Sequence, residues 1–126
     1  YMEEAERLCD RLLLLKDGKI IDEGAPRELI DRFAGLEVLE MHGVEEAPIK
    51  VLSSHFNTWY RQFGGGFIMG IVPSKGEMMW EAASTLTSDM GRFAEIQRMK
   101  RSVTLRRRAS TLEDVFLVIT GTGLED

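Results

Sequence analysis

The stretch that decides the fold runs from Met2 to Leu29 and reads MEEAERLCDRLLLLKDGKIIDEGAPREL. Met2 to Asp10 predicts a short helix, because the acidic side chains in its first turns suit the positive end of the helix dipole. Leu12 to Leu15 is an apolar run too short for a helix, so it predicts a strand buried on both faces. Asp17-Gly18 then predicts a tight hairpin turn, which needs positive φ at both central positions.

The chain after this turn completes a hairpin and begins a second helix. Lys19 to Asp22 is the expected return strand. Pro26 stands where the start of a helix tolerates a missing N–H, and Arg27 to Phe33 supplies one or two helical turns. Gly35 is a plausible helix stop, and we place a domain boundary there. Residues 1–35 are therefore expected to form a helix, a hairpin and a helix, and residues 36–126 an accessory α/β domain.

The first half of the accessory domain predicts a strand and a helix. Neither face of Leu36 to His42 is cleanly apolar, which favours a strand near a sheet edge. Pro48 is expected to open a helix, and Gly64-Gly65-Gly66 to end it as a flexible connector. No Lys-Ser or Lys-Thr pair follows these glycines, which argues against a phosphate loop. The apolar stripe of this helix steps by four, three and four residues: Leu52, Phe56, Trp59 and Phe63.

The second half predicts a strand and a helix twice over. Phe67 to Val72 is expected to be the central strand, with Gly70 as a point of close approach. Ser74 and Glu77 have the spacing of a capping box. The helix that follows is expected to end at Gly91, and its inward-facing residues are Met79, Ala83, Leu86 and Met90. Ile96 to Arg108 is then expected to form a long strand.

A closing helix is expected after a cap at Ser110 or Thr111, with Gly121 as its stop. Its apolar positions are Leu112, Val115, Phe116 and Ile119. From Leu36 the predicted order is therefore strand, helix, strand, helix, strand, helix. The predicted fold class is α/β (α+β): a small mixed sheet with helices packed on it, preceded by a helix and a β-hairpin.

Composition narrows the classes of function. The 126 residues are 44% hydrophobic and 29% charged, with a net charge of −5. These values are typical of a folded globular domain, and the acidic balance argues against nucleic acid as a partner. No apolar run approaches the ~20 residues that span a bilayer. The single cysteine, Cys9, is expected to pack as a small apolar side chain in a reducing compartment.

Three groups of side chains are candidates for a site. The basic patch of Lys100, Arg101 and Arg106 to Arg108 is more typical of a solvated strand paired with acids than of a phosphate or partner contact. His42 and His55 lack other ligands at metal-binding spacing. Trp59 and Trp80 with Met78 and Met79 could line a hydrophobic pocket, although core packing is the simpler interpretation.

The sequence offers no set of catalytic residues. No Ser-His-Asp or Cys-His set can be assembled from it, and the pattern G-x-x-x-x-G-K-[ST] is missing. We therefore predict no catalytic, cofactor-binding or metal-binding residue in this chain.

Two motifs that bracket the chain resemble those of one family. Met2 to Arg11, with the hairpin and the helix that follow, resembles the end of the nucleotide-binding domain of ATP-binding cassette (ABC) transporter ATPases. Thr111 to Leu117 with Thr120-Gly121 resembles the closing motif of the exporter branch, which includes antibiotic-resistance and nodulation-factor efflux ATPases. In that family the first motif directly follows the switch histidine, so the Walker A, signature and Walker B motifs and that histidine would all lie upstream of Tyr1.

The resemblance implies a role for the chain within a larger protein. The parent would bind ATP and Mg²⁺ and couple hydrolysis to export through a membrane permease. This part would be a non-catalytic interaction or regulatory domain that contacts a second ATPase subunit or stabilises the catalytic domain. It would be cytoplasmic and would reach the membrane only indirectly, through the permease. A small-molecule sensor that binds a hydrophobic ligand is the alternative.

The leucines of the first stretch also predict how the isolated chain behaves. Residues Leu12 to Leu15 would be evolved to pack on elements that this chain does not contain, so we expect two copies to cover them in a symmetric dimer. The alternative is that the hairpin folds back onto the sheet of the accessory domain.

Overall fold

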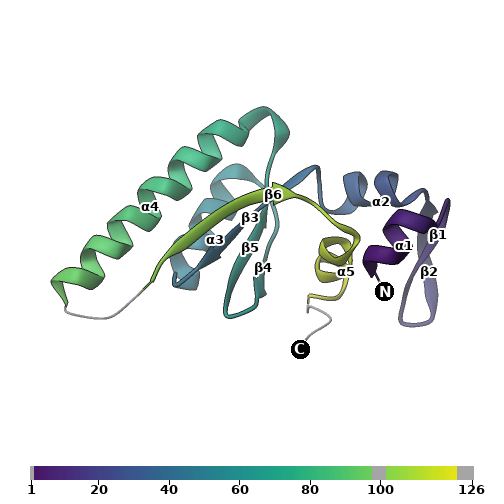
Figure 1. Ribbon diagram of the computed structural model, residues 1–126, viewed down its shortest axis with the longest axis horizontal. Coiled ribbons are helices and arrows are strands. Elements are labelled where there is room, and N and C mark those ends of the chain that lie inside the picture. The colour runs from purple at the N-terminus through teal and green to yellow at the C-terminus, as the bar shows by residue number, and fades with distance from the viewer. Residues whose placement is uncertain (1, 98–101, 122–126) are drawn as a thin grey trace.

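The computed structural model describes residues 2–97 and 102–121 (Figure 1). Helix α1 (Met2–Leu8) leads into strands β1 (Leu12–Lys16) and β2 (Lys19–Gly24), which pair with each other in an antiparallel hairpin. Asp17 and Gly18 have φ of 53° and 76°, which confirms the predicted turn. Helix α2 (Pro26–Phe33) follows, with Pro26 in its first turn as predicted.

The larger sheet of the described chain has the strand order β4-β5-β3-β6 and is antiparallel throughout. Along the sequence, strands and helices follow one another as β-α-β-β-α-β, which with this strand order is the ferredoxin-like arrangement. The predicted fold class, α/β (α+β), is confirmed. The predicted mixed sheet is wrong, because every strand pair of the described sheet is antiparallel, and the predicted alternation of strands and helices misses the strand Tyr60–Phe63. The elements are β3 (Glu37–His42), α3 (Glu46–Phe56), β4 (Tyr60–Phe63), β5 (Gly66–Gly70), α4 (Gly76–Ile96) and β6 (Thr104–Ala109), and α5 (Leu112–Thr120) follows them.

The two faces of the larger sheet are covered by different helices. Leu39 and Met41 of β3 lie in the main core, which α3 and α4 complete from one side. Val38 and Ile68 point to the opposite face, where they pack against Leu117 of α5. Figure 1 shows the same division, with α3 and α4 on one side of the sheet and α5 between the sheet and the N-terminal elements. Helix α5 therefore lies between the two parts of the chain.

The prediction that Leu36 to His42 lies near a sheet edge is wrong, because β3 pairs with β5 on one side and with β6 on the other. The edge is predicted because Glu40 makes one face of the strand look polar. Glu40 lies on the α5 side of the sheet and is 9% exposed, and its charge is paired there with Arg108. A buried acid with a buried partner leaves a mixed pattern on an interior strand.

The prediction of one helix from Pro48 to Phe63 is also wrong. Helix α3 ends at Phe56, because Asn57 adopts the left-handed conformation with φ of 52°. Phe63 belongs to strand β4 instead. The predicted flexible connector is a tight turn: Gly64 and Gly65 have φ of 51° and 79° and join β4 to β5.

Helix α4 differs from its prediction at both ends. Ser74 lies in a short 3-10 turn (Pro73–Lys75) and α4 begins at Gly76, so the predicted capping box does not form. The helix continues through Gly91 to Ile96, and strand β6 begins only at Thr104. The predicted long strand from Ile96 to Arg108 is therefore wrong, and its residues 98–101 lie outside the described chain. The predicted inward stripe of α4 is confirmed, with Met79 and Ala83 fully buried.

Two further predictions about single residues are confirmed. Thr111 is the N-cap of α5, where its N–H donates to Asp114 Oδ2 at 2.8 Å, and Gly121 ends the helix with φ of 79°. Gly70 is a point of close approach, because a Cβ built there would lie 2.4 Å from the indole nitrogen of Trp59.

Candidate interaction surface

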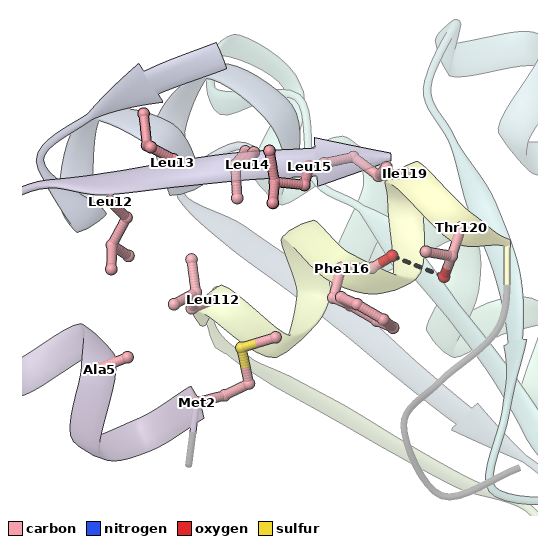
Figure 2. A pocket seen from close by; sticks show the side chains of 10 residues that line it. All are labelled: Met2, Ala5, Leu12, Leu13, Leu14, Leu15, Leu112, Phe116, Ile119 and Thr120. Carbon is pink, nitrogen blue, oxygen red and sulfur yellow. Dashed lines mark hydrogen bonds between the residues drawn. The ribbon is translucent and has the colours of Figure 1, made fainter. Parts of the chain in front are cut away.

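An apolar groove lies between the N-terminal elements and α5. It encloses about 250 Å³ and is lined by side chains of α1, β1 and α5. Figure 2 shows Met2, Leu12 and Leu112 pointing into this space, while Leu13 points away from α5. The remaining lining residues are Ala5, Leu14, Leu15, Phe116, Ile119 and Thr120.

The uncovered face of the hairpin carries an exposed apolar strip. Leu13 and Leu15 of β1 are 54% and 61% exposed, so the prediction that Leu12 to Leu15 is buried on both faces is wrong for the chain by itself. Leu15 lies opposite Ile20 of β2 in the hairpin register, and Ile20 is exposed too. Adjacent exposed side chains of this size are typical of a surface that another molecule covers. We call Leu13, Leu15, Ile20 and Ile21 the hairpin strip.

The hairpin does not join the larger sheet. Strands β1 and β2 form a sheet of their own, and the inner face of β1 packs with Leu12 and Leu14 against the cluster around α5. The fold-back onto the accessory sheet, which was the alternative to self-association, is therefore not observed.

Both ends of α5 are held by charged side chains from the N-terminal elements. Glu6 of α1 accepts the backbone N–H of Leu112 at 2.9 Å, in the first turn of α5. Lys16 of β1 donates to the carbonyl of Ile119 at 2.9 Å, in the last turn. A carboxylate at a helix N-terminus and an ammonium group at its C-terminus both complement the helix dipole. These two contacts clamp α5 to the segment that precedes the larger sheet.

A buried ion cluster fixes the other side of α5. Arg108 of β6 donates to both carboxylate oxygens of Asp114, at 2.8 and 2.9 Å, and through Nε to Glu40 at 2.5 Å. The side chain of Asp114 is 2% exposed and that of Glu40 is 12% exposed. The hydrogen bonds to Asp114, followed by those to Glu40, raise the pKa of Arg108 above its ordinary value. Arg108 is therefore charged at any accessible pH and joins three elements.

The described part of the predicted basic patch is divided between the two faces of the sheet. Arg107 points toward α4 and pairs with Glu37 at 2.7 Å and with Glu77 at 2.9 Å, and these hydrogen bonds raise its pKa. Arg108 points toward α5, and Arg106 is exposed. The interpretation as a strand paired with acids is confirmed for Arg107 and Arg108. Lys100 and Arg101 lie outside the described residues.

The remaining candidates do not come together. Trp59 donates to the carbonyl of Ala34 at 3.2 Å on the α5 side, whereas Trp80 packs on the opposite core with the buried Met79. The alternative of a Trp and Met pocket is thus not observed. The favoured interpretation, core packing, is confirmed for Trp59, Trp80 and Met79 but is wrong for Met78, which is 58% exposed. Cys9 is exposed, so its predicted packing is wrong. His42 lies 3.9 Å from Glu40, and within residues 2–97 and 102–121 no group of three or more His, Cys, Asp or Glu side chains is placed to hold a metal ion.

Sequence reasoning missed the two side chains that clamp α5. Glu6 and Lys16 carry ordinary surface charges in a helix and in a strand, and their partners are more than a hundred residues away in sequence. Local pattern offers no signal for either contact. Ile20 and Ile21 were assigned only to a return strand, although their adjacency to the leucines of β1 could have indicated the hairpin strip.

Comparison with known proteins finds relatives that match the chain over almost its whole length. No protein-family model matches it. It is 34% identical over 125 residues to "Nod factor export ATP-binding protein I" of Rhizobium etli, and this match covers 99% of the chain and 34% of the relative. The proteins of the same name from Burkholderia lata and Sinorhizobium fredii are each 32% identical over 126 residues, and the matches cover 36% and 32% of their lengths. The chain is thus similar, over its whole length, to part of these export ATP-binding proteins.

These relatives confirm the resemblance inferred from the two bracketing motifs. The matches span the whole chain, including the ferredoxin-like part, and are consistent with a C-terminal segment of an ABC ATPase. The chain spans about a third of the length of the curated relatives that it matches. Among the helices that the structure describes, none is both long and apolar enough to cross a membrane.

Proposed function

We propose that this chain is a non-catalytic, interaction-bearing part of an ABC export ATP-binding protein. The observation that carries the proposal is the hairpin strip, which lies beside the groove in a chain that is a third as long as its relatives. Each large apolar side chain that is left in water forgoes about 1.5 to 3 kcal/mol of burial. An exposed apolar surface of this kind typically marks a site where a protein partner binds.

The partner that fits this surface is apolar and belongs to the exporter. The covering surface comes from the ATP-binding part of the parent protein, from its second ATPase subunit, or from both. The parent binds ATP and Mg²⁺ and couples hydrolysis to export through a membrane permease, which holds it at the cytoplasmic face of the membrane. The relatives' name, which specifies export and ATP binding, supports this role.

The lack of catalysis is tested on the chain itself. Nucleotide chemistry needs a loop that cradles phosphates and an acid that holds Mg²⁺. We expect an ATP titration to give no saturable heat and a phosphate-release assay to give no Mg²⁺-dependent signal. Hydrolysis that co-elutes with the protein through two columns would refute the proposal.

The interaction surface is tested by the association state of the chain. In isolation the chain lacks its partner, so we propose that two copies cover the hairpin strip of each other. Sedimentation equilibrium at micromolar concentration is expected to show a dimer. The double variant Leu13→Glu, Leu15→Glu places charges on the strip and is expected to be monomeric.

Val51 supplies the matched control, because it is 68% exposed on α3 and lies away from the hairpin. Val51→Glu should dimerise as the unchanged chain does. A monomeric unchanged chain would contradict self-association, and a dimer that survives both charges would place the interface elsewhere. Binding of the separately expressed ATP-binding part of the parent, lost in the double variant and kept in Val51→Glu, then tests the native partner.

A further inference from the structure

The ferredoxin-like part of the chain begins and ends at the same place. The backbone N–H of Ser110 donates to the carbonyl of Leu36 at 2.9 Å, and in the next register position Ala109 of β6 lies opposite Glu37 of β3. The chain therefore enters and leaves this part through two adjacent strands. We call this crossing the neck. Termini that lie close together are typical of a domain that can be inserted into another unit.

Beyond the neck, α5 packs with the elements at the other end of the sequence. Leu112 and Val115 share a buried cluster with Ile30 and Ala34, which lie in α2 and just after it. Side chains of α1 and β1 pack against the same cluster, among them Met2, Ala5, Leu12 and Leu14. In Figure 1 α5 lies beside α1 and α2 accordingly. Helix α1, the hairpin, α2 and α5 thus bury one common core, and we call them the terminal unit.

The ends of α5 are contacted from both sides. At its start, Glu6 of the terminal unit accepts from Leu112, while Arg108 of the larger sheet binds Asp114. At its end, Lys16 of β1 donates to Ile119, while Arg61 of β4 donates to the carbonyl of Val118 at 2.9 Å. Each end of this short helix therefore has one charged partner in each unit.

We infer that α5 belongs to the terminal unit and connects it mechanically to the ferredoxin-like domain. In this division the ferredoxin-like domain is inserted between α2 and α5. The partners of α5 hold that domain in place relative to the terminal unit. This division differs from the one placed at Gly35 from sequence, which assigned α5 to the accessory domain. It follows that a displacement of α1 or the hairpin displaces α5, and that α5 transmits it through Leu117 and Asp114 to the larger sheet. If the proposed function holds, this is the route by which the ATP-binding part positions the inserted domain.

Native-state hydrogen exchange on the full chain tests which unit α5 belongs to. Amides that open together share one opening free energy, so exchange identifies cooperative units. The variants Glu6→Ala and Lys16→Met each remove one clamp from the terminal unit. Loss of such an end contact is expected to speed exchange of the α5 and α2 amides by roughly threefold to tenfold, with β3 and β5 unchanged.

Matched controls carry the same substitutions at neighbouring exposed sites. Glu4 lies in the same helix as Glu6, and Lys19 lies across the hairpin from Lys16, so the control variants are Glu4→Ala and Lys19→Met. Neither should change exchange in α5. The inference is overturned if the clamp variants act no more strongly than these controls, if α5 exchanges together with β3, or if all elements accelerate equally. The experiment needs no ATP and no partner, so it can fail or succeed independently of the proposed function.

Discussion

Replacing Arg108 with methionine tests whether the buried ion cluster holds α5 on the larger sheet. The change removes the guanidinium that binds both Asp114 and Glu40, and leaves two carboxylates with side chains that are 2% and 12% exposed. Breaking a buried pair in this way typically costs about 3 to 5 kcal/mol. Because the Arg108 side chain is itself 20% exposed, and Asp114 keeps the N–H of Thr111, the lower end of about 3 kcal/mol is expected here.

Urea denaturation followed by circular dichroism measures this loss. With a slope of ~1.5 to 2 kcal/mol/M, the unfolding midpoint should fall by roughly 1.5 to 2 M. Arg106→Met is the matched control, because Arg106 lies on the same face of β6 and is exposed, and it should change the free energy of unfolding by about 0.5 kcal/mol or less. Equal effects of the two variants, or an unchanged midpoint for Arg108→Met, would refute the reasoning.

Three further predictions concern other contacts. The hydrogen bond from Arg32 lowers the pKa of Asp22, so the ionised carboxylate stabilises the folded chain. This contribution should be present above about pH 4 and vanish as the pH falls below it. Thermal melts of the unchanged chain and of Asp22→Asn from about pH 2 to 7 measure it. Leu117→Ala should cost about 2 to 5 kcal/mol and more than Phe116→Ala, because Leu117 is 1% exposed and Phe116 only half-buried; the reverse order in urea melts would contradict this packing. Asn57→Ala should destabilise by about 1 kcal/mol, because the short polar side chain of Asn tolerates the left-handed conformation better than Ala does. Asn57→Gly should be nearly neutral, because Gly has no Cβ, and equal melting temperatures of the two variants would exclude this strain.

Local signals in the sequence predicted the elements whose causes are local. Asp17-Gly18, Pro26 and Gly121 act within a few residues of themselves, and each stands where it was expected. Hydrophobic periodicity gave a wrong prediction where a residue with left-handed backbone conformation interrupts the pattern. The stripe from Leu52 to Phe63 fits a helix, but the left-handed Asn57 ends α3 and sends the chain into β4.

Contacts between distant residues were beyond local reasoning. Glu40 reads as a solvent-facing acid until Arg108 is placed beside it by the pairing of β3 with β6. The clamps of Glu6 and Lys16 on α5 likewise depend on the whole fold. The leucines of β1 were recognised as a surface in need of a partner, yet which of them remain exposed depends on how α5 lies beneath the strand.

The three consecutive arginines of β6 have a consequence for growth of the sheet. Strand β6 is an edge of the larger sheet, and an edge strand is a template on which another copy can add. If two β6 strands paired antiparallel about Arg107, Arg107 of one copy would lie opposite Arg107 of the other, and Arg106 would lie opposite Arg108. Like charges set directly across a strand pair repel. Arg107 and Arg108, which fasten the sheet to α4 and α5, therefore also disfavour the addition of another copy along the β6 edge.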